Sequence, residues 1–292
     1  MSESTKQAAR HALLLTCCVL LSIFFNVSSA SCKDEKIIFL HHSTGGVIYN
    51  DGDVPEWFDD YNSSHGTNYQ INERAYPTGS YPWRNYPYDY WNLWVNGACS
   101  ATEASTHCLD QLTADYDVII FKNCYPVSDV LEDTGTPDIT SQRKSLENYK
   151  LQYGAVRDKL QQYPDNLFIF WTGAPRHRLA TDAAKAARAR EFANWVKGDM
   201  LAGGSYPNIR VFDYFDLTAG SDNFLRYEYE RSHTGSDSHP NTQAAQDVGP
   251  VFSQFIIDSA QDFFDSGNGT GGTGSQGNST TTIIPSLIML LQ

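Results

Sequence analysis

Three short segments hold the side chains best suited to chemistry. Ser43 follows an apolar run in HHSTGG, Asn123 follows another in IIFKNCYP, and His239 lies near the carboxyl end of the chain in SDSHPN. A serine hydroxyl becomes a nucleophile when a base lies within hydrogen-bond reach, a third group orients that base, and donors receive the oxyanion. These residue types predict attack by Ser43 on an acyl group, with His239 as the base.

Neighbouring residues supply the remaining roles. Asp237 lies two residues before His239, and we expect it to orient the imidazole ring. The backbone N–H of Ser43 and the side-chain amide of Asn123 can donate to the oxyanion. No cofactor is predicted for this chemistry.

The elements that must position these residues are visible as apolar runs and helical periodicities. Short apolar runs that end in polar residues are typical of buried parallel strands, and they occur at 36–42, 116–123, 166–173 and 208–215. Apolar side chains recur at helical spacing at 141–163, 181–201 and 242–264. This alternation predicts a three-layer α/β/α sandwich around a central, mostly parallel sheet. Ligands bind at the carboxyl ends of such strands, where Ser43 and Asn123 fall.

The order of these segments resembles that of the SGNH (GDSL-like) hydrolase superfamily, which comprises serine esterases and acetyl esterases on a flavodoxin-like sheet. The family's nucleophile block follows the first strand, as Ser43 does, and its asparagine block follows the third strand of the fold, as Asn123 does. Its last block places an Asp and a His-Pro pair before the final helix, as in DSHPN. The resemblance spans residues 37–264 and implies a serine esterase.

Three features depart from the family pattern. The family's glycine block has no clear counterpart between the first and middle strands, and Gly79, in YPTGSYPW, is the candidate for the oxyanion donor that the resemblance implies there. The usual Gly-Asp before the serine is His41-His42 in this chain. The family's aspartate lies three residues before the histidine, where this chain has Ser236, while Asp237 is only two residues before. A one-residue offset turns the side chain, which leaves open whether Asp237 or a backbone carbonyl orients His239.

Other interpretations of the same residues remain open. Ser43 could be an ordinary helix N-cap, since Ser-Thr-Gly often precedes a helix. His41 and His42 could bind a metal together with Asp213 or His239, as in a metal-dependent hydrolase, although adjacent strand residues point in opposite directions. A third possibility is a non-catalytic glycan-binding protein on the same fold.

The segment 76–94 is dense in aromatic residues, with the sequence YPTGSYPWRNYPYDYWNLW. Exposed aromatic rings interleaved with Asn, Asp and Arg suit stacking on sugar rings. The same composition also suits a proline-rich loop that packs over the core. If the rings stack on sugars, a carbohydrate ester, such as an acetyl ester, becomes the favoured substrate. A small-molecule ester is the other substrate class left open.

Composition and net charge limit the number of domains and the kinds of partner to be expected. The 292 residues are 41% hydrophobic, which is enough for one sizeable core, and no linker interrupts residues 33–264, so a single domain at 31–265 is expected. The net charge of −13 excludes nucleic acid as a partner, because a polyanion needs Lys and Arg to displace its counterions.

Both ends of the chain carry signals of export. Residues 1–30 have a basic start, an apolar stretch and small residues at the end, which predicts a secretory signal peptide; an uncleaved anchor helix or an acylated Cys32 are the alternatives. Residues 266–292 form a Gly/Ser/Thr-rich tail with a short apolar end. That tail predicts either attachment to the cell surface or simple disorder. A secreted or cell-surface location is therefore expected.

Four cysteines follow the predicted signal peptide. Cys99 and Cys108 are close in sequence and could form a disulfide across one loop, as an oxidising compartment would allow. Cys124 could pair as well, or it could remain a buried thiol beside a strand end.

Overall fold

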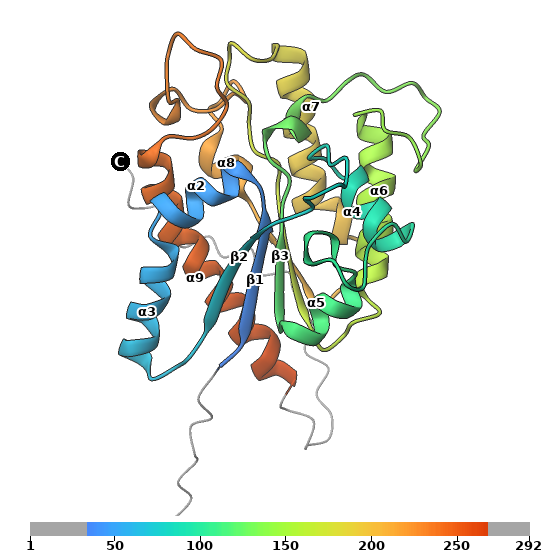
Figure 1. The fold of residues 1–292 in the computed structure, drawn as a ribbon. Coiled ribbons are helices and arrows are strands. Elements are labelled where there is room, and N and C mark those ends of the chain that lie inside the picture. Colours follow the sequence, from blue (N-terminus) through green and yellow to red (C-terminus); the bar gives the residue numbers. More distant parts are fainter. Residues whose placement is uncertain (1–33, 268–292) are drawn as a thin grey trace, which may run out of the picture.

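A computed structural model describes residues 34–267, and its centre is a five-stranded, all-parallel sheet (Figure 1). The strand order is β2-β1-β3-β4-β5, with strands β1 (Lys36–His41), β2 (Gln70–Ala75), β3 (Val118–Phe121), β4 (Leu167–Trp171) and β5 (Ile209–Phe212). This is the doubly wound order of flavodoxin-like proteins. It confirms the predicted three-layer α/β/α sandwich.

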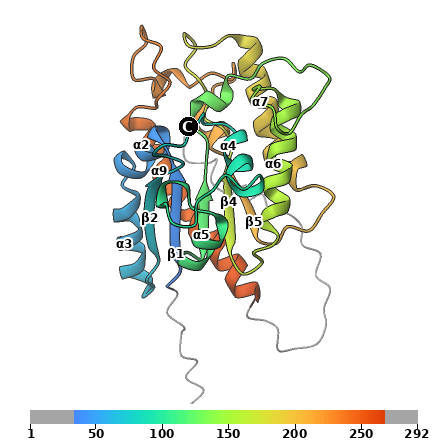
Figure 2. The ribbon, with the colours of Figure 1, turned by 45° about the vertical axis from the view of Figure 1, so that its right-hand side comes forward.

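Helices cover both faces of the sheet (Figure 1 and Figure 2). One face carries α2 (Ser43–Asp51), α3 (Val54–His65) and α9 (Thr242–Gly267), and the other carries α4 (Tyr88–Tyr90), α5 (Leu109–Asp115), α6 (Leu146–Leu160) and α7 (Ala183–Lys197). Helix α8 (Tyr214–Thr218) directly follows β5. Single turns lie at Trp91–Val95, Ala104–Thr106, Tyr125–Ser128, Asp199–Leu201 and Tyr227–Tyr229.

The four predicted strands and three predicted helices are all present. Strands β1, β3 and β4 are buried along nearly their whole length, which is why they read as continuous apolar runs. The helices are shorter than their periodic segments at α6 and α7. Helix α7 begins where the Asp182 carboxylate accepts a hydrogen bond of 2.9 Å from the backbone N–H of Lys185.

Strand β2 was not predicted from the sequence. It lies at the edge of the sheet, its sequence is QINERA, and none of its side chains is buried. An edge strand outside the core needs no apolar run, so its sequence lacks the pattern by which the buried strands were identified. Helices α3 and α5 were missed as well, because each buries only two residues.

Strand register brings the ends of the strands to one edge. Leu40 lies opposite Phe121, which in turn lies opposite Phe170. The segments after β1, β3, β4 and β5 therefore emerge side by side at the carboxyl edge. Ser43 and Asn123 both come from this edge, as the sequence predicted.

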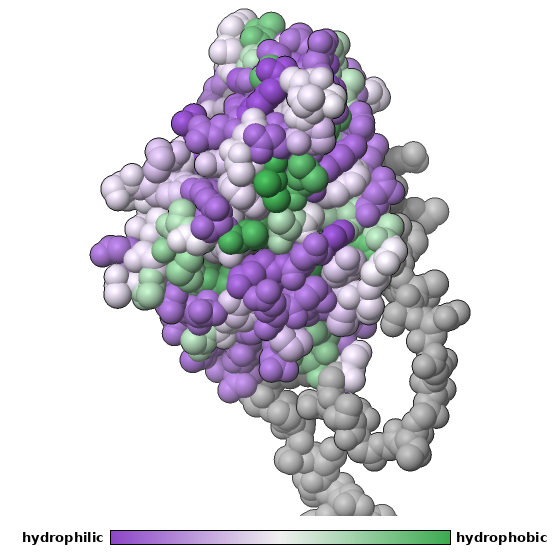
Figure 3. All heavy atoms as spheres, turned by 90° about the vertical axis from the view of Figure 1, so that its right-hand side faces the viewer, coloured by the Kyte–Doolittle hydropathy of each residue, from purple (hydrophilic) through white to green (hydrophobic). Residues whose placement is uncertain are grey.

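The surface on the α6 and α7 side is mostly hydrophilic, with small separate hydrophobic spots (Figure 3). Within residues 34–267 no helix is both long enough and apolar enough to cross a bilayer. The predicted signal peptide, Cys32 and nearly all of the predicted tail lie outside the described residues. Helix α9 extends to Gly267, two residues beyond the predicted end of the domain.

Cys99 and Cys108 form a disulfide, which confirms the predicted bridge across that loop. Cys124 is a buried free thiol, and this resolves the alternative left open for it.

Candidate active site

Ser43 is the first residue of α2, at the point where the chain leaves strand β1. The N-cap position belongs to His42, and the Ser43 hydroxyl lies 2.7 Å from Nε2 of His239, a residue 196 positions later. The interpretation of Ser43 as a helix cap is therefore wrong. Its hydroxyl is exposed to solvent and hydrogen bonded to a potential base.

A sharp turn between β1 and α2 places Ser43. The N–H groups of Gly45 and Gly46 both donate to the carbonyl of His42, at 2.8 and 3.1 Å. A Cβ atom on Gly45 would lie only 2.4 Å from Cβ of His41, so this position has room only for glycine. The first N–H groups of the helix have no partner within it and point toward the end that carries Ser43.

His239 is oriented by Asp237. Oδ1 of Asp237 lies 2.5 Å from Nδ1 of His239 and also accepts a hydrogen bond of 3.0 Å from the His239 backbone N–H. The tight turn closed by that backbone contact brings the carboxylate back to the ring. The offset of one residue from the family pattern thus does not prevent Asp237 from reaching His239.

The charge of Asp237 fixes the tautomer of His239. Burial raises the pKa of Asp237, but hydrogen bonds from the backbone and ring of His239, together with the charge of Arg231, outweigh it and hold the pKa below its usual value. A carboxylate can only accept, so Nδ1 carries the proton. Nε2 is then left as an acceptor for the Ser43 hydroxyl, which is the arrangement that a general base requires.

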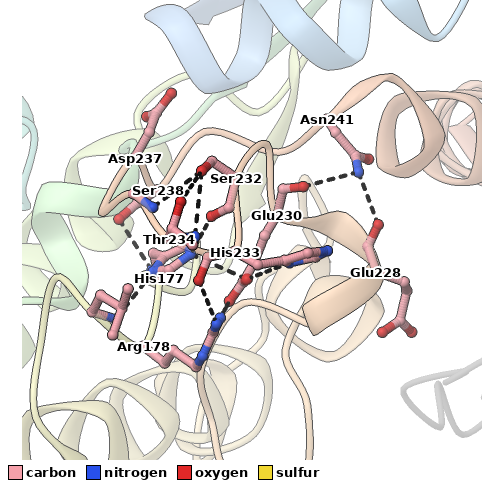
Figure 4. Close-up of polar contacts among 12 residues, drawn as sticks. His177, Arg178, Glu228, Glu230, Ser232, His233, Thr234, Asp237, Ser238 and Asn241 are labelled. Atoms are coloured by element: carbon pink, nitrogen blue, oxygen red, sulfur yellow. Dashed lines mark hydrogen bonds and ion pairs between the residues drawn. The ribbon is translucent and has the colours of Figure 1, made fainter.

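The loop that carries Asp237 and His239 is held by a buried carboxylate, Glu230 (Figure 4). Glu230 contacts Nε2 of His177 at 3.2 Å and Nδ1 of His233 at 2.9 Å, and it accepts a short hydrogen bond from Arg178. Burial raises the pKa of Glu230, but these partners outweigh it and lower the pKa. The carboxylate is therefore charged and paired at neutral pH.

Two further side chains join the same loop to its surroundings through three hydrogen bonds (Figure 4). The hydroxyl of Ser238, the residue before His239, accepts a hydrogen bond of 3.1 Å from the backbone N–H of His177. Asn241 donates to the carbonyls of Glu228 and Glu230 at 2.8 and 3.2 Å. The residues on either side of His239 are thus fixed to the segment after β4 and to the start of their own loop.

Two aromatic side chains lie against histidines of the candidate site. The Tyr125 ring meets the His239 ring edge-on, with centroids 5.0 Å apart. Trp83 stacks on the His42 ring at 4.0 Å and remains 43% exposed. The aromatic segment 76–94 otherwise packs into the core, where Tyr76, Tyr90 and Trp94 are buried. The interpretation of the segment as a loop packed over the core therefore holds for these three rings, while stacking on a sugar ring remains a prediction for the exposed Trp83.

The structure does not join Asn123 and Gly79 to this pair by any contact among residues 34–267. Asn123 is 3% exposed, and its amide nitrogen donates to the hydroxyl of Tyr153 at 2.6 Å. Gly79 has a φ of +69° and lies against Ser105. Their roles as oxyanion donors remain predictions.

Asn85 is a functional candidate that the sequence did not indicate. It has a φ of 65°, is 5% exposed, and its side-chain oxygen accepts a hydrogen bond of 3.1 Å from the Cys124 N–H at the end of β3. Its own N–H donates to Asp89 at 2.7 Å. The Asn85 amide nitrogen has no hydrogen-bond partner within residues 34–267, so it is an oriented donor left unused. Asparagine is enriched at positive φ, which could signal a turn here but not the direction of the amide.

A buried lysine lies beneath the nucleophile turn. Nζ of Lys122 is 3.3 Å from Sγ of Cys124, and burial lowers the pKa of Lys122. Burial works against the Cys124 thiolate, but Lys122 and Thr44 outweigh it and lower the pKa of Cys124. Burial, followed by the charge of Lys122, lowers the pKa of His42 to about 4. The His42 ring next to Ser43 is therefore neutral at pH 7.

The residues proposed for a metal site do not assemble. Nε2 of His41 lies 2.7 Å from Glu73, the His42 ring stacks on Trp83, and Asp213 pairs with Lys197 at 2.7 Å. In the described part of the chain, no group of three or more His, Cys, Asp or Glu side chains is placed to hold a metal ion.

Comparisons with known proteins find only distant likenesses. No family model matches the chain, and no curated protein matches it. One solved structure, from Streptococcus pneumonia, is described as a candidate platelet activating factor. It is 12% identical to this chain, with a TM-score of 0.43, and the match covers 88% of this chain and 100% of that structure's chain. A second solved structure is a carbohydrate esterase whose active site is described as having divergent catalytic and non-catalytic binding functions. It is 13% identical to this chain, with a TM-score of 0.40, and the match covers 80% of this chain and 72% of that structure's chain. Function is therefore inferred from the site alone.

Proposed function

We propose that this chain is a serine hydrolase that cleaves ester bonds. One observation carries the proposal: a continuous line of hydrogen bonds runs from Ser43 Oγ to His239 Nε2 at 2.7 Å and from His239 Nδ1 to Asp237 at 2.5 Å. A nucleophile, a base within reach and a carboxylate that orients the base are the three groups that acyl transfer by serine requires.

The proposed reaction has two halves. In the first, Ser43 Oγ attacks the acyl carbon while His239 Nε2 takes its proton, and the same proton passes to the leaving alcohol as the ester C–O bond breaks. In the second, water attacks the acyl-serine, His239 takes a proton from that water, and the proton returns to Ser43 as the acid leaves. Asp237 stabilises the imidazolium in both halves without being protonated itself.

Two donors are proposed for the oxyanion. The Ser43 backbone N–H lies at the start of α2, where helix N–H groups have no partner within the helix. The Asn85 amide is held in one orientation by the backbone N–H of Cys124. The thiol of Cys124 is in turn hydrogen bonded to the backbone of Thr44, the residue after Ser43. Asn123 and Gly79 remain alternative donors. Loss of a true donor costs about 100- to 1000-fold in rate.

Carbohydrate esters, and acetyl esters in particular, are the proposed substrates. One face of Trp83 stacks on His42, directly before Ser43, and the rest of the ring is exposed, so that a sugar ring could stack there during attack on its ester. Small-molecule esters would reach Ser43 equally well because its side chain is exposed. Export to the cell surface or beyond is proposed from the residue pattern at 1–30 and 266–292.

Turnover of p-nitrophenyl acetate tests the proposal. We expect hydrolysis by the intact chain, loss of it in Ser43→Ala, and retention in Ser64→Ala, a matched change of an exposed serine on α3. Equal rates in the intact chain and Ser43→Ala would contradict the proposal. Glycan binding that survives Ser43→Ala in a protein without turnover would instead favour the non-catalytic glycan-binding alternative.

A further inference from the structure

Positive charge gathers at one place beside the proposed active site. Arg176, Lys185 and Lys144 all converge on the single carboxylate of Asp129, at 3.5, 3.4 and 3.9 Å. All four side chains are between a fifth and a third exposed. This excess of cations stands out in a chain whose net charge is −13.

Nearby acids do not cancel this excess. Asp182 contacts Lys185 at 3.5 Å but also caps helix α7. Burial lowers the pKa of Lys144, and the charges of Arg176, Lys185 and Arg84 lower it further, against the opposing effect of Asp129. Lys144 therefore has three cationic neighbours, Arg176, Lys185 and Arg84, beside its carboxylate partner.

The cluster lies one aromatic side chain away from His239. The Arg176 guanidinium lies over the Tyr125 ring, 5.8 Å from its centroid, and the edge of that ring meets His239 at 5.0 Å. Lys144 donates to the carbonyl of Pro126, the residue after Tyr125, at 3.2 Å. The Arg176 Nε atom is buried and has no hydrogen-bond partner within residues 34–267. Arg176, Lys144 and Lys185 thus share one carboxylate, and one donor of Arg176 is left without a partner among the described residues, one aromatic ring away from His239.

We propose that Arg176 and Lys144 form a carboxylate-binding subsite. The alcohol part of the ester substrate then carries a carboxylate of its own, as an acidic sugar residue does. This inference rests on the esterase function proposed above and names the substrate class for the same site. A guanidinium fork matches the geometry of a carboxylate, and a cationic patch raises the rate at which an anionic substrate arrives. Trp83, which stacks on His42 and is 43% exposed, can stack on the sugar ring with its exposed part.

Two esters that differ in charge but little in size test the subsite: 4-acetoxybenzoate, which is anionic, and 4-acetoxybenzamide, which is neutral. We expect kcat/KM of the intact chain to favour the anion by about 10-fold, a preference that about 1 M salt removes by screening. Arg176→Gln and Lys144→Gln should each lower the anion-to-neutral ratio several-fold. Lys150→Gln, which removes an exposed lysine of α6 paired with Glu191, should leave the ratio unchanged.

The outcomes separate the subsite from the esterase function. Ser43-dependent hydrolysis of both esters at equal kcat/KM would keep the esterase and overturn the subsite. Equal losses on both esters in Arg176→Gln and Lys144→Gln would assign the cluster a structural role and also overturn it. Absence of Ser43-dependent turnover of either ester would overturn the function and the subsite together.

Discussion

The two halves of the proposed active site are positioned by different kinds of forces. Ser43 lies on the nucleophile side, where strand β1, a two-residue glycine turn and helix α2 fix it by close packing. His239 lies on the base side, in a loop that is fixed by the buried Glu230 and its three cationic or imidazole partners (Figure 4). Packing tolerates little change in volume, whereas an ionic network tolerates little change in charge. Each side should therefore fail under a different substitution.

The largest effect is expected from Asp237→Asn, which alters the base itself. The amide would favour the tautomer of His239 with its proton on Nε2, so that Nε2 could no longer accept from Ser43. We expect kcat to fall by about 1000- to 10,000-fold, as loss of the orienting carboxylate does in serine hydrolases, with little change in thermal stability. Steady-state kinetics and a melting curve measure this. Asp59→Asn, a matched change of an exposed aspartate, should leave kcat and thermal stability unchanged. Full activity of Asp237→Asn would instead assign the orientation of His239 to a backbone carbonyl.

Asn85→Ala should have the next largest effect, because it removes a proposed oxyanion donor that is held by Cys124 at the end of β3. If the Asn85 amide holds the oxyanion, kcat should fall by about 100- to 1000-fold. Asn123→Ala is the comparison: its amide donates to Tyr153, so the change should mainly lower stability. A large loss of kcat at Asn123 with none at Asn85 would reverse the assignment.

Gly45→Ala tests the packing of the nucleophile side. The added methyl group would meet Cβ of His41 at 2.4 Å, which has to displace α2 and Ser43 with it. A shift of about 1 Å costs about 100-fold in rate, and we expect about 3 kcal/mol of lost stability from overpacking. At Gly46 the nearest atom would be the ring carbon Cε1 of His41, at 3.4 Å. Gly46→Ala should therefore be tolerated, and equal damage at both positions would contradict this account of the turn.

Glu230→Gln tests the ionic network of the base side and should have the smallest effect on rate. We expect about 3 kcal/mol of lost stability, since Arg178 and His177 lose a buried carboxylate, and about 10-fold lower kcat with KM nearly unchanged. The network lowers the pKa of Glu230 below 4.5. Its stabilisation is therefore present above pH 4.5 and is lost as the pH falls through the lower pKa of the folded state.

At neutral pH, Glu230→Gln should accordingly have a lower free energy of unfolding than the intact chain. As the pH falls, that free energy should change less in Glu230→Gln than in the intact chain. Glu228→Gln is the matched control, because its side chain is exposed and only its backbone carbonyl joins the network. Stability of Glu230→Gln equal to that of Glu228→Gln would show that the network does not hold the loop.

The same contrast explains how much of the molecule could be predicted from the sequence. The nucleophile side follows local rules, so an apolar run followed by Ser-Thr-Gly-Gly indicated both the strand and the residue at its end. The base side depends on contacts between distant segments: Arg178 meets Glu230 across 52 residues, and no local pattern carries that information.

Individual residues show where the sequence pattern ends. His239 was predicted because His-Pro before a helix matches a family pattern, but the direction of Asp237 required the turn closed by the His239 N–H. The amide direction of Asn85 depends on a bond to Cys124, 39 residues away. Strand β2 has no buried side chain, so it lacks the apolar run that identified the other four strands.

The central claim is that His239 activates Ser43, and covalent labelling by a fluorophosphonate tests it most directly. The measurement is the labelling rate in the intact chain and in His239→Ala, with the modified residue located by peptide mass spectrometry. We predict a label on Ser43 and a rate that falls at least about 1000-fold in His239→Ala. A label on another residue, or labelling of Ser43 at the same rate without His239, would contradict the claim.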